Sequence, residues 1–386
     1  MYLRRVRALA ATGAGPLPWP AVGRACPTTF AVAPPDLAGA ARRRWLLDRL
    51  EGEVDHLLIR HDFSPVGVPP PALHATCNGA GDAWTQAFPD PAVSASCASG
   101  LHALWLARHH LPARVVAVDV VQAHSHQHFE ALRVVDAAAR PFAPDNPGFI
   151  PGEAAVAVEV AAEGPGVPLA GPVLGTDLAA LLATLPERPA VVYAQGSGPE
   201  PLDRQELLAL PPGIPVRMPL AWHGHTLGAS GLLALAHAVE AGEGPALVVT
   251  RALTGACAAV LVGATRPWPQ PVWPYGTPGE APALHHPQLR RLAAEALAHR
   301  PARPPALLAV HLPAPLVPPP EAVLRGVPLP SAIREMTPGF AAALVARCWG
   351  FHGPATALVG GMACAMLAAV PDVQVVQVAT DGIDWG

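Results

Sequence analysis

Residues 93–104 read Val-Ser-Ala-Ser-Cys-Ala-Ser-Gly-Leu-His-Ala-Leu, so that an apolar β-like run passes through small residues into an Ala/Leu-rich helix. Cys97 lies at the junction. A thiol there meets the positive end of the helix dipole and free N–H groups, which lower its pKa and favour the thiolate. Small neighbours permit a sharp turn and the close approach of an acyl group to backbone donors. A buried, inert cysteine is the alternative for a free thiol.

Outward from this turn, short β-like runs alternate with Ala/Leu-rich helical runs. The alternation predicts a layered α/β fold in which strands are buried between helices. The predicted strands are 114–121, 154–161, 190–194, 246–250 and 256–262, and the predicted helices are 98–110, 178–185, 203–210 and 228–241. Proline is concentrated at 64–71, 266–282 and 312–320, and the second of these segments is the strongest candidate for a domain boundary.

The composition excludes several classes of protein. A formal net charge of −4 gives no basic surface for nucleic acid. All 25 basic residues are Arg, which excludes a Schiff-base or P-loop lysine. The six cysteines form no C-x-x-C pair, so no metal or other cofactor is predicted. No signal-like opening and no run of eighteen apolar residues occurs, which predicts a cytoplasmic protein with free thiols and no membrane contact.

Four stretches, in order, resemble the signature segments of the β-ketoacyl-acyl-carrier-protein synthases (ketosynthases). The nucleophile turn is matched by S-A-S-C-A-S-G-L-H-A-L, and the other three matches are 140–154 (RPFAPDNPGFIPGEA), 193–203 (YAQGSGPEPLD) and 223–231 (HGHTLGASG). Residues 250–262 occupy the place of the closing Gly-rich strand pair. The resemblance covers about residues 90–263. It implies a thiolase-like layered fold, with mixed sheets sandwiching helices, and fatty-acid or polyketide-type biosynthesis on an acyl carrier protein.

The resemblance also implies roles for individual residues. Cys97 matches the cysteine that takes an acyl chain as a thioester, and His225 matches the second family histidine. Gln195 stands where the family has its first histidine. A glutamine keeps an N–H donor that can polarise a thioester carbonyl, but it cannot shuttle a proton. Leu220 replaces the family's lysine, and Leu253 replaces its gate-keeping aromatic residue. These departures predict slow or altered condensation, or acyl transfer to Cys97 without condensation.

Other polar residues of these motifs are interpreted as structural. Asp145 and Glu153 lie among Gly and Arg, where a carboxylate caps backbone N–H groups or pairs with an arginine. His223 has no counterpart in the family motif and is interpreted as a neutral neighbour of His225.

The last hundred residues resemble the front half of a second ketosynthase. Residues 354–380 repeat the pattern of 91–121, with a β run, a small-residue turn, an Ala/Leu helix and a second β run, although Ala-rich βαβ units also look alike by composition alone. In this second turn Met362 falls on the cysteine position, with Cys364 two residues later, as in the inactive partners called chain-length factors. The predicted division is a first thiolase-like half (1–160), a second half (161–265), a Pro-rich linker (266–290) and a partial ketosynthase-like segment (291–386).

Two functions therefore remain open, besides a decayed and inactive relative. The protein is an acyl-transferring or condensing enzyme acting through Cys97, His225 and Gln195, or a non-catalytic partner of the chain-length-factor kind. The implied partners are an acyl carrier protein and a second subunit, in a homodimer or in a heterodimer with another ketosynthase.

Overall fold

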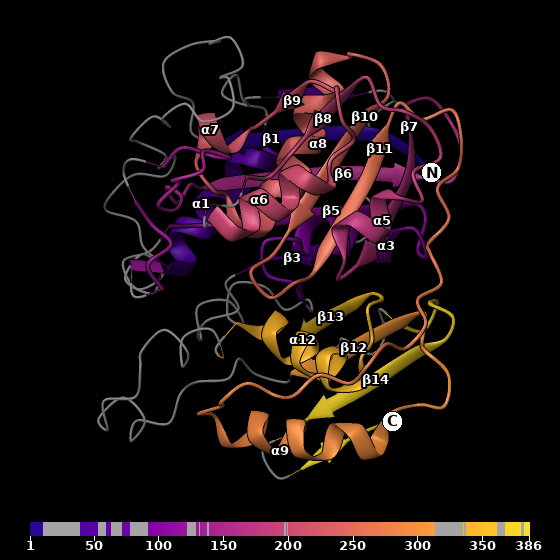
Figure 1. Ribbon diagram of the computed structural model, residues 1–386. Coiled ribbons are helices and arrows are strands. Elements are labelled where there is room, and N and C mark those ends of the chain that lie inside the picture. Colours follow the sequence, from indigo (N-terminus) through magenta and orange to yellow (C-terminus); the bar gives the residue numbers. More distant parts are fainter. Residues whose placement is uncertain are drawn as a thin grey trace.

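The computed structural model (Figure 1) describes residues 1–10, 39–52, 59–62, 72–77, 92–121, 129–130, 132–136, 139–196, 198, 200–312, 335, 337–360, 367–379 and 382–386. Its strands are β1 (Tyr2–Ala10), β2 (Ile59–Asp62), β3 (Ala72–Ala75), β4 (Ala92–Ser94), β5 (Ala113–Asp119), β6 (Ala154–Ala161), β7 (Val167–Gly175), β8 (Val191–Tyr193), β9 (Val216–Arg217), β10 (Ala246–Arg251), β11 (Cys257–Val262), β12 (Leu307–Leu312), β13 (Ala355–Val359), β14 (Val373–Val378) and β15 (Ile383–Asp384).

Its helices are α1 (Gly39–Glu51), α3 (Ser99–Ala107), α5 (Leu178–Leu182), α6 (Glu200–Ala209), α7 (Leu220–His223), α8 (Ser230–Ala241), α9 (Pro287–Ala296) and α12 (Pro338–Trp349), with 3-10 turns η1 (Leu227–Ala229) and η2 (Leu297–His299). All five predicted strands and all four predicted helices are present, with their ends shifted by a few residues. Within the described part of the chain, no helix is long and apolar enough to cross a membrane.

The described residues as far as Val262 form alternating layers of helix and sheet. Helices α3 and α8 pack against each other, against β5 and β6 on one side and against β10 and β11 on the other. All nine residues of α3 are buried, as expected of a helix between two sheets. Helix α1 covers the outer face of β1, β5 and β6, and α5 covers β7 and β11. The predicted thiolase-like α/β layering is therefore confirmed.

One continuous sheet path joins the two ends of the chain. Its order is β15-β14-β12-β13-β4-β3-β5-β6-β1-β7-β11-β10-β8-β9, with β2 added to β1. Strand β4, which leads into the Cys97 turn, pairs with β3 on one side and antiparallel with β13 on the other. Strands from the C-terminal segment therefore continue the sheet from the edge of β4, and Figure 1 shows them with α9 and α12 at one end of the molecule.

The sheet has local two-fold pseudosymmetry about the pair Val93 and Leu358. On one side β3 lies parallel to both β4 and β5, and on the other β12 lies parallel to both β13 and β14. The strands of the predicted repeat are thus confirmed. The offset that carries Val93 onto Leu358 also carries Cys97 onto Met362 in the sequence. Met362 and Cys364 lie outside the described residues.

The Pro-rich segment after β11 is held against the body of the molecule. Gln270 donates to the carbonyl of Leu174 (2.7 Å) and accepts from its N–H (2.9 Å). The indole of Trp268 is buried and donates to Thr184 Oγ1 at 3.0 Å. Helix α9 begins at Pro287, inside the range predicted as linker. These contacts tie the start of the C-terminal segment to β7 and α5.

Candidate active site

Cys97 lies in a tight turn between β4 and α3. Ser96, just before it, adopts a left-handed backbone conformation with φ of 52°, which is unusual for a residue with a side chain. The Ser99 hydroxyl holds the turn by accepting from the N–H of Ala95 at 2.9 Å and donating to the carbonyl of Thr76 at 2.9 Å. Cys97 is buried, with 5% of its surface exposed. The sharp strand-to-helix turn expected from the small residues is therefore present.

His225 lies beside the thiol. Its Nε2 is 3.1 Å from Cys97 Sγ, and its Nδ1 is 3.3 Å from Ser230 Oγ. Ser230 in turn lies 3.2 Å from Thr226 Oγ1. The ring of Phe149 packs edge-on against the imidazole, with centroids 4.6 Å apart. Contacts on both nitrogens and one face fix the imidazole orientation, and Nε2 is aimed at sulfur.

The surroundings of Cys97 favour its thiolate. The pKa of the Cys97 thiol is lowered well below its ordinary value, first because the Cys77 thiol donates a hydrogen bond to it and then through the charge and hydrogen bond of His225. Burial acts in the opposite direction, but does not outweigh these contacts. The described cysteines (77, 97, 257 and 348) are free thiols, and no group of three His, Cys, Asp or Glu among the described residues is placed to hold a metal.

The 148–153 loop positions the backbone of His225. The His225 N–H donates to the Ile150 carbonyl at 2.7 Å, and the Gly152 N–H donates to the His225 carbonyl at 3.0 Å. A side chain at position 152 would place its Cβ 1.9 Å from the carbonyl oxygen of His223, so only glycine fits. Backbone hydrogen bonds thus join the 140–154 motif to the 223–231 motif at His225.

Buried carboxylates fix the segment that carries Gln195. Glu206 accepts from the N–H groups of Gln195 (2.7 Å) and Gly196 (3.2 Å). Burial, and then the neighbouring Asp203, raise the pKa of Glu206 to about 8. Asp203 accepts from the N–H of Phe142 and from Asn146 Nδ2, at 2.9 and 3.0 Å. These bonds join the second and third sequence motifs.

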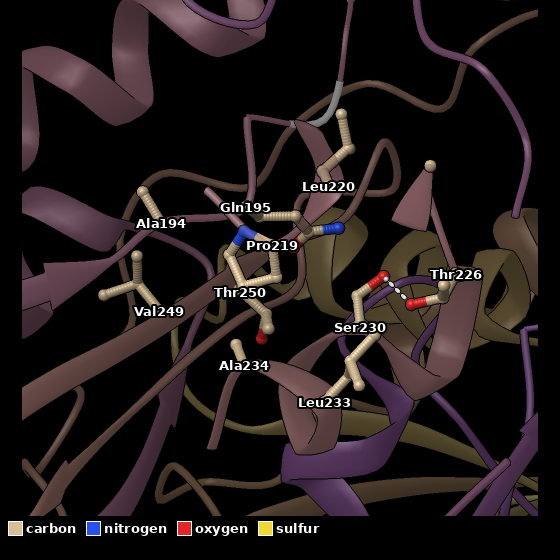
Figure 2. A pocket seen from close by; sticks show the side chains of 11 residues that line it. Ala194, Gln195, Pro219, Leu220, Thr226, Ser230, Leu233, Ala234, Val249 and Thr250 are labelled. Atoms are coloured by element: carbon tan, nitrogen blue, oxygen red, sulfur yellow. Dashed lines mark hydrogen bonds between the residues drawn. The ribbon is translucent and has the colours of Figure 1, made fainter. Parts of the chain in front are cut away.

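The structure does not bring Gln195 into contact with the thiol. Its Oε1 accepts from the Arg251 N–H at 2.7 Å, while its Nε2 is buried and has no hydrogen-bond partner among the described residues. Figure 2 shows this amide nitrogen pointing into a small pocket that is lined also by Leu220 and Ser230. A buried unpaired N–H is costly, so this donor is available to a group that enters the pocket.

Positions 220 and 253, where this chain departs from the ketosynthase pattern, carry apolar side chains. Leu220 begins α7, is 5% exposed and packs in the core with Met218 and Ala221, so no charge lies there. Leu253 is half-buried in the turn between β10 and β11. The next residue, Thr254, donates to Ser96 Oγ at 3.4 Å. This turn therefore reaches the nucleophile turn without a gate-keeping aromatic ring.

The structural interpretation of Glu153 and Asp145 agrees with their contacts. Glu153 is buried, forms an ion pair with Arg42 and accepts from the Val121 N–H at 3.0 Å. Asp145 pairs with Arg140 at the exposed surface. His223 lies with its Nε2 2.8 Å from that of His237, in a stacked pair. Burial, and then His223, lower the pKa of His237 to about 3, so His237 is neutral in this pair near pH 7.

Sequence reasoning missed three residues that shape the site: Ser230 behind His225, Cys77 beside Cys97, and Asp119. Asp119 Oδ2 accepts from the N–H groups of Cys77 (2.9 Å) and Gly228 (2.7 Å). Ser230 lies inside a recognised motif, five residues after His225, and that spacing was the available signal. Cys77 and Asp119 carry no motif, and only the fold shows that they are near the thiol.

The alternating layers, with the buried helix α3 after the Cys97 turn, define a thiolase-like fold of the ketosynthase type. Among solved structures, the PfaC keto synthase–chain length factor superposes with a TM-score of 0.55 at 13% identity, over 74% of this chain and 53% of that one. This chain thus spans about half the length of that protein. A mutant ketosynthase from module 6 of the bacillaene synthase of Bacillus subtilis 168 gives a TM-score of 0.41 at 16% identity, over 60% of this chain and 58% of that one. No protein-family model and no curated protein matches the sequence.

Proposed function

We propose that this protein accepts an acyl group as a thioester on Cys97, delivered by an acyl carrier protein in a fatty-acid or polyketide-type pathway. The observation that supports this proposal most strongly is the 3.1 Å contact between Cys97 Sγ and His225 Nε2 at the strained turn before α3. Nucleophile, base and a hydroxyl behind the base form one chain of hydrogen-bonding groups.

The acyl transfer can be written as a balanced reaction that uses only the groups present in the site. The Cys97 thiolate attacks the carbonyl carbon of the acyl carrier thioester and forms a new C–S bond. The C–S bond to the carrier then breaks, and the carrier's thiolate leaves with the electron pair. A proton held at His225 Nε2 is placed to reach the leaving sulfur. Acyl transfer therefore needs no group beyond Cys97, His225 and the surrounding backbone.

Condensation requires a further group that stabilises an enolate, and we infer that condensation by this protein is slow or absent. Decarboxylation of a malonyl thioester develops negative charge on an enolate oxygen, which a charged or proton-carrying donor stabilises best. Gln195 offers a neutral amide N–H, and Leu220 offers no charge. Gln195 Nε2 is nevertheless an unpaired donor aimed into a pocket, which suits a thioester carbonyl.

The alternative function is a non-catalytic partner of the chain-length-factor kind, which would shape the pocket of an active ketosynthase. The uncharged Gln195 and Leu220 favour it. In that role, the ketosynthase would have to bind this chain away from the edge of β4 or displace β13, since β13 already pairs with β4. We propose that residues 291–386 stand in for part of a second subunit, while 1–160 and 161–265 are the two thiolase-like halves and 266–290 links them to that segment.

Intact-mass spectrometry after incubation with acyl carrier thioesters tests the proposal. We expect one acyl adduct on the wild type, no adduct on Cys97→Ala, and an unchanged adduct on Cys348→Ala, which removes another buried thiol. Addition of malonyl carrier thioester is expected to release little CO₂. A folded wild type that never gains the acyl mass would contradict the proposal, and stable co-purification with a full-length ketosynthase would then support the partner function.

A further inference from the structure

A second cavity, of about 250 Å³, lies where the C-terminal end of α3 meets the Pro-rich segment and the C-terminal segment. Most of its wall is apolar or aromatic, and is formed by Trp105, Pro271, Trp273, Pro304, Pro305 and Val370. Val272 lines the cavity as well and is 93% exposed, so the cavity opens to solvent. Because a cavity of about 150 Å³ holds benzene, this one has room for a ring that carries a polar substituent.

The cavity is separate from the site of Cys97. Helix α3 begins two residues after Cys97, and Arg108, which lines the cavity, follows its last residue. Nine helical residues span about 14 Å. A molecule in this cavity therefore lies at the opposite end of α3 from the nucleophile turn.

Arg108 presents a fixed guanidinium to the cavity. Its Cζ lies over the ring of Trp105, 4.6 Å from the centroid. Its Nε donates to His109 Nε2 at 3.2 Å, and its Nη1 donates to the Pro172 carbonyl at 3.4 Å. Its Nη2 has no hydrogen-bond partner in the part of the chain that the structure describes. The group is thus held in one orientation and keeps a donor for a ligand.

This guanidinium lacks a counter-ion. Arg108 is half-buried, and no carboxylate among the described residues forms an ion pair with it. Burial lowers the pKa of Arg108 to about 10, so the group is still cationic near pH 7. A partly buried cation without a partner is costly, and an anion that enters the cavity removes this cost.

Asp372 limits the charge that a ligand can carry. It is the acidic residue of the cavity lining, and it is exposed to solvent, which weakens its repulsion of an anion. A second negative charge on the ligand would add to that repulsion without a second cation to offset it. The lining therefore favours a monoanion over a dianion.

His109 adds a neutral donor beside Arg108. Burial, and then the charge of Arg108, lower the pKa of His109 to about 4, so the imidazole is neutral near pH 7. Because its Nε2 accepts from Arg108, its proton lies on Nδ1. The His109 ring also packs edge-on against Trp105, with centroids 5.0 Å apart. One charged donor, one neutral donor and apolar walls are the usual features of a small-molecule site.

We propose that this cavity binds a small monocarboxylate, whose carboxylate accepts from Arg108 and whose aromatic or aliphatic body packs between Trp105 and Trp273. Trp273 is a fixed wall, because its indole donates to the Leu174 carbonyl at 3.2 Å. This site is independent of the proposed acyl transfer, since its ligand touches neither Cys97 nor His225.

Calorimetric titration with benzoate at pH 7 tests the proposal. We expect the wild type to bind benzoate with a Kd of about 1 mM or tighter. Arg108→Met keeps an unbranched side chain over Trp105 but removes the charge, and is expected to bind at least about tenfold more weakly. The matched control is Arg290→Met, the same substitution at an exposed position of α9, which is expected to bind as the wild type does.

Two further probes make the wild type sufficient if Arg108→Met does not fold. Benzamide has the shape of benzoate without its charge, and phenyl phosphate carries a second charge; both are expected to bind at least about tenfold more weakly than benzoate. Equal binding of benzamide and benzoate would overturn the proposal. Benzoate binding that is unchanged in Arg108→Met, or absent at about 10 mM in the wild type, would overturn it too.

Discussion

Replacing Leu358 by Asp is expected to destabilise the whole chain by about 4 kcal/mol or more, because it removes a buried leucine and buries an unpaired carboxylate. Leu358 is fully buried and pairs with Val93 of β4, the strand before the Cys97 turn, at the centre of the pseudosymmetric sheet. Helix α12 lies against the nucleophile turn too, since a Cβ at Gly339 would approach the Ser96 nitrogen to 3.0 Å. We therefore expect the loss to reach Cys97 and not only the C-terminal segment.

Thermal unfolding and the alkylation rate of Cys97 measure this effect. The matched control is Leu208→Asp, the same substitution on α6 where the side chain is 76% exposed, and it is expected to change stability by no more than about 0.5 kcal/mol. A Leu358→Asp protein that melts with the wild type and keeps its Cys97 reactivity would show that β13 does not complete the sheet.

Replacing His225 by Ala is expected to slow acyl loading of Cys97 by about 100-fold or more. The variant removes the nitrogen that lies 3.1 Å from Sγ and that also holds the proton for the leaving thiolate. It leaves Ser230 without its 3.3 Å partner, but alters no backbone bond of the turn. Single-turnover mass spectrometry, in which adduct growth is followed in time, measures the rate without interference from later steps.

His352→Ala, which truncates an exposed imidazole, is the control and is expected to load at the wild-type rate. Loading by the folded His225→Ala protein at the rate of this control would contradict a role for His225 in the transfer.

The parts of the fold that were predictable from sequence rest on local pattern. The β-branched runs at 114–121 and 246–250 form strands because alternate side chains reach buried layers, and the Ala/Leu run after Cys97 forms a helix buried on every face. Cys97 was a candidate because of its small-residue strand-to-helix turn and the family resemblance, and His225 because the resemblance matches it to a family histidine. Their 3.1 Å contact joins segments more than a hundred residues apart, and only the fold supplies it.

The remaining features of the fold and of the site depend on contacts between distant segments, which no local sequence pattern encodes. The antiparallel register between β4 and β13 is set by long-range packing, although the weak repeat had suggested two similar units. Cys77 lies in no sequence motif, and its place beside the Cys97 turn follows from the pairing of β3 with β4 and from the bonds of Asp119 to Cys77 and Gly228. Gln195 was assigned its role by resemblance alone; its side-chain carbonyl accepts from the Arg251 N–H, and its Nε2 faces a pocket that Ser230 also lines.

In the proposed function, the acyl group resides on Cys97. Proteolysis of the acyl-loaded wild type, followed by tandem mass spectrometry, locates the adduct on a single side chain. The acyl mass is expected on Cys97, and none is expected on Cys77 or the other thiols. An adduct on another residue, or one that survives in Cys97→Ala, would contradict it.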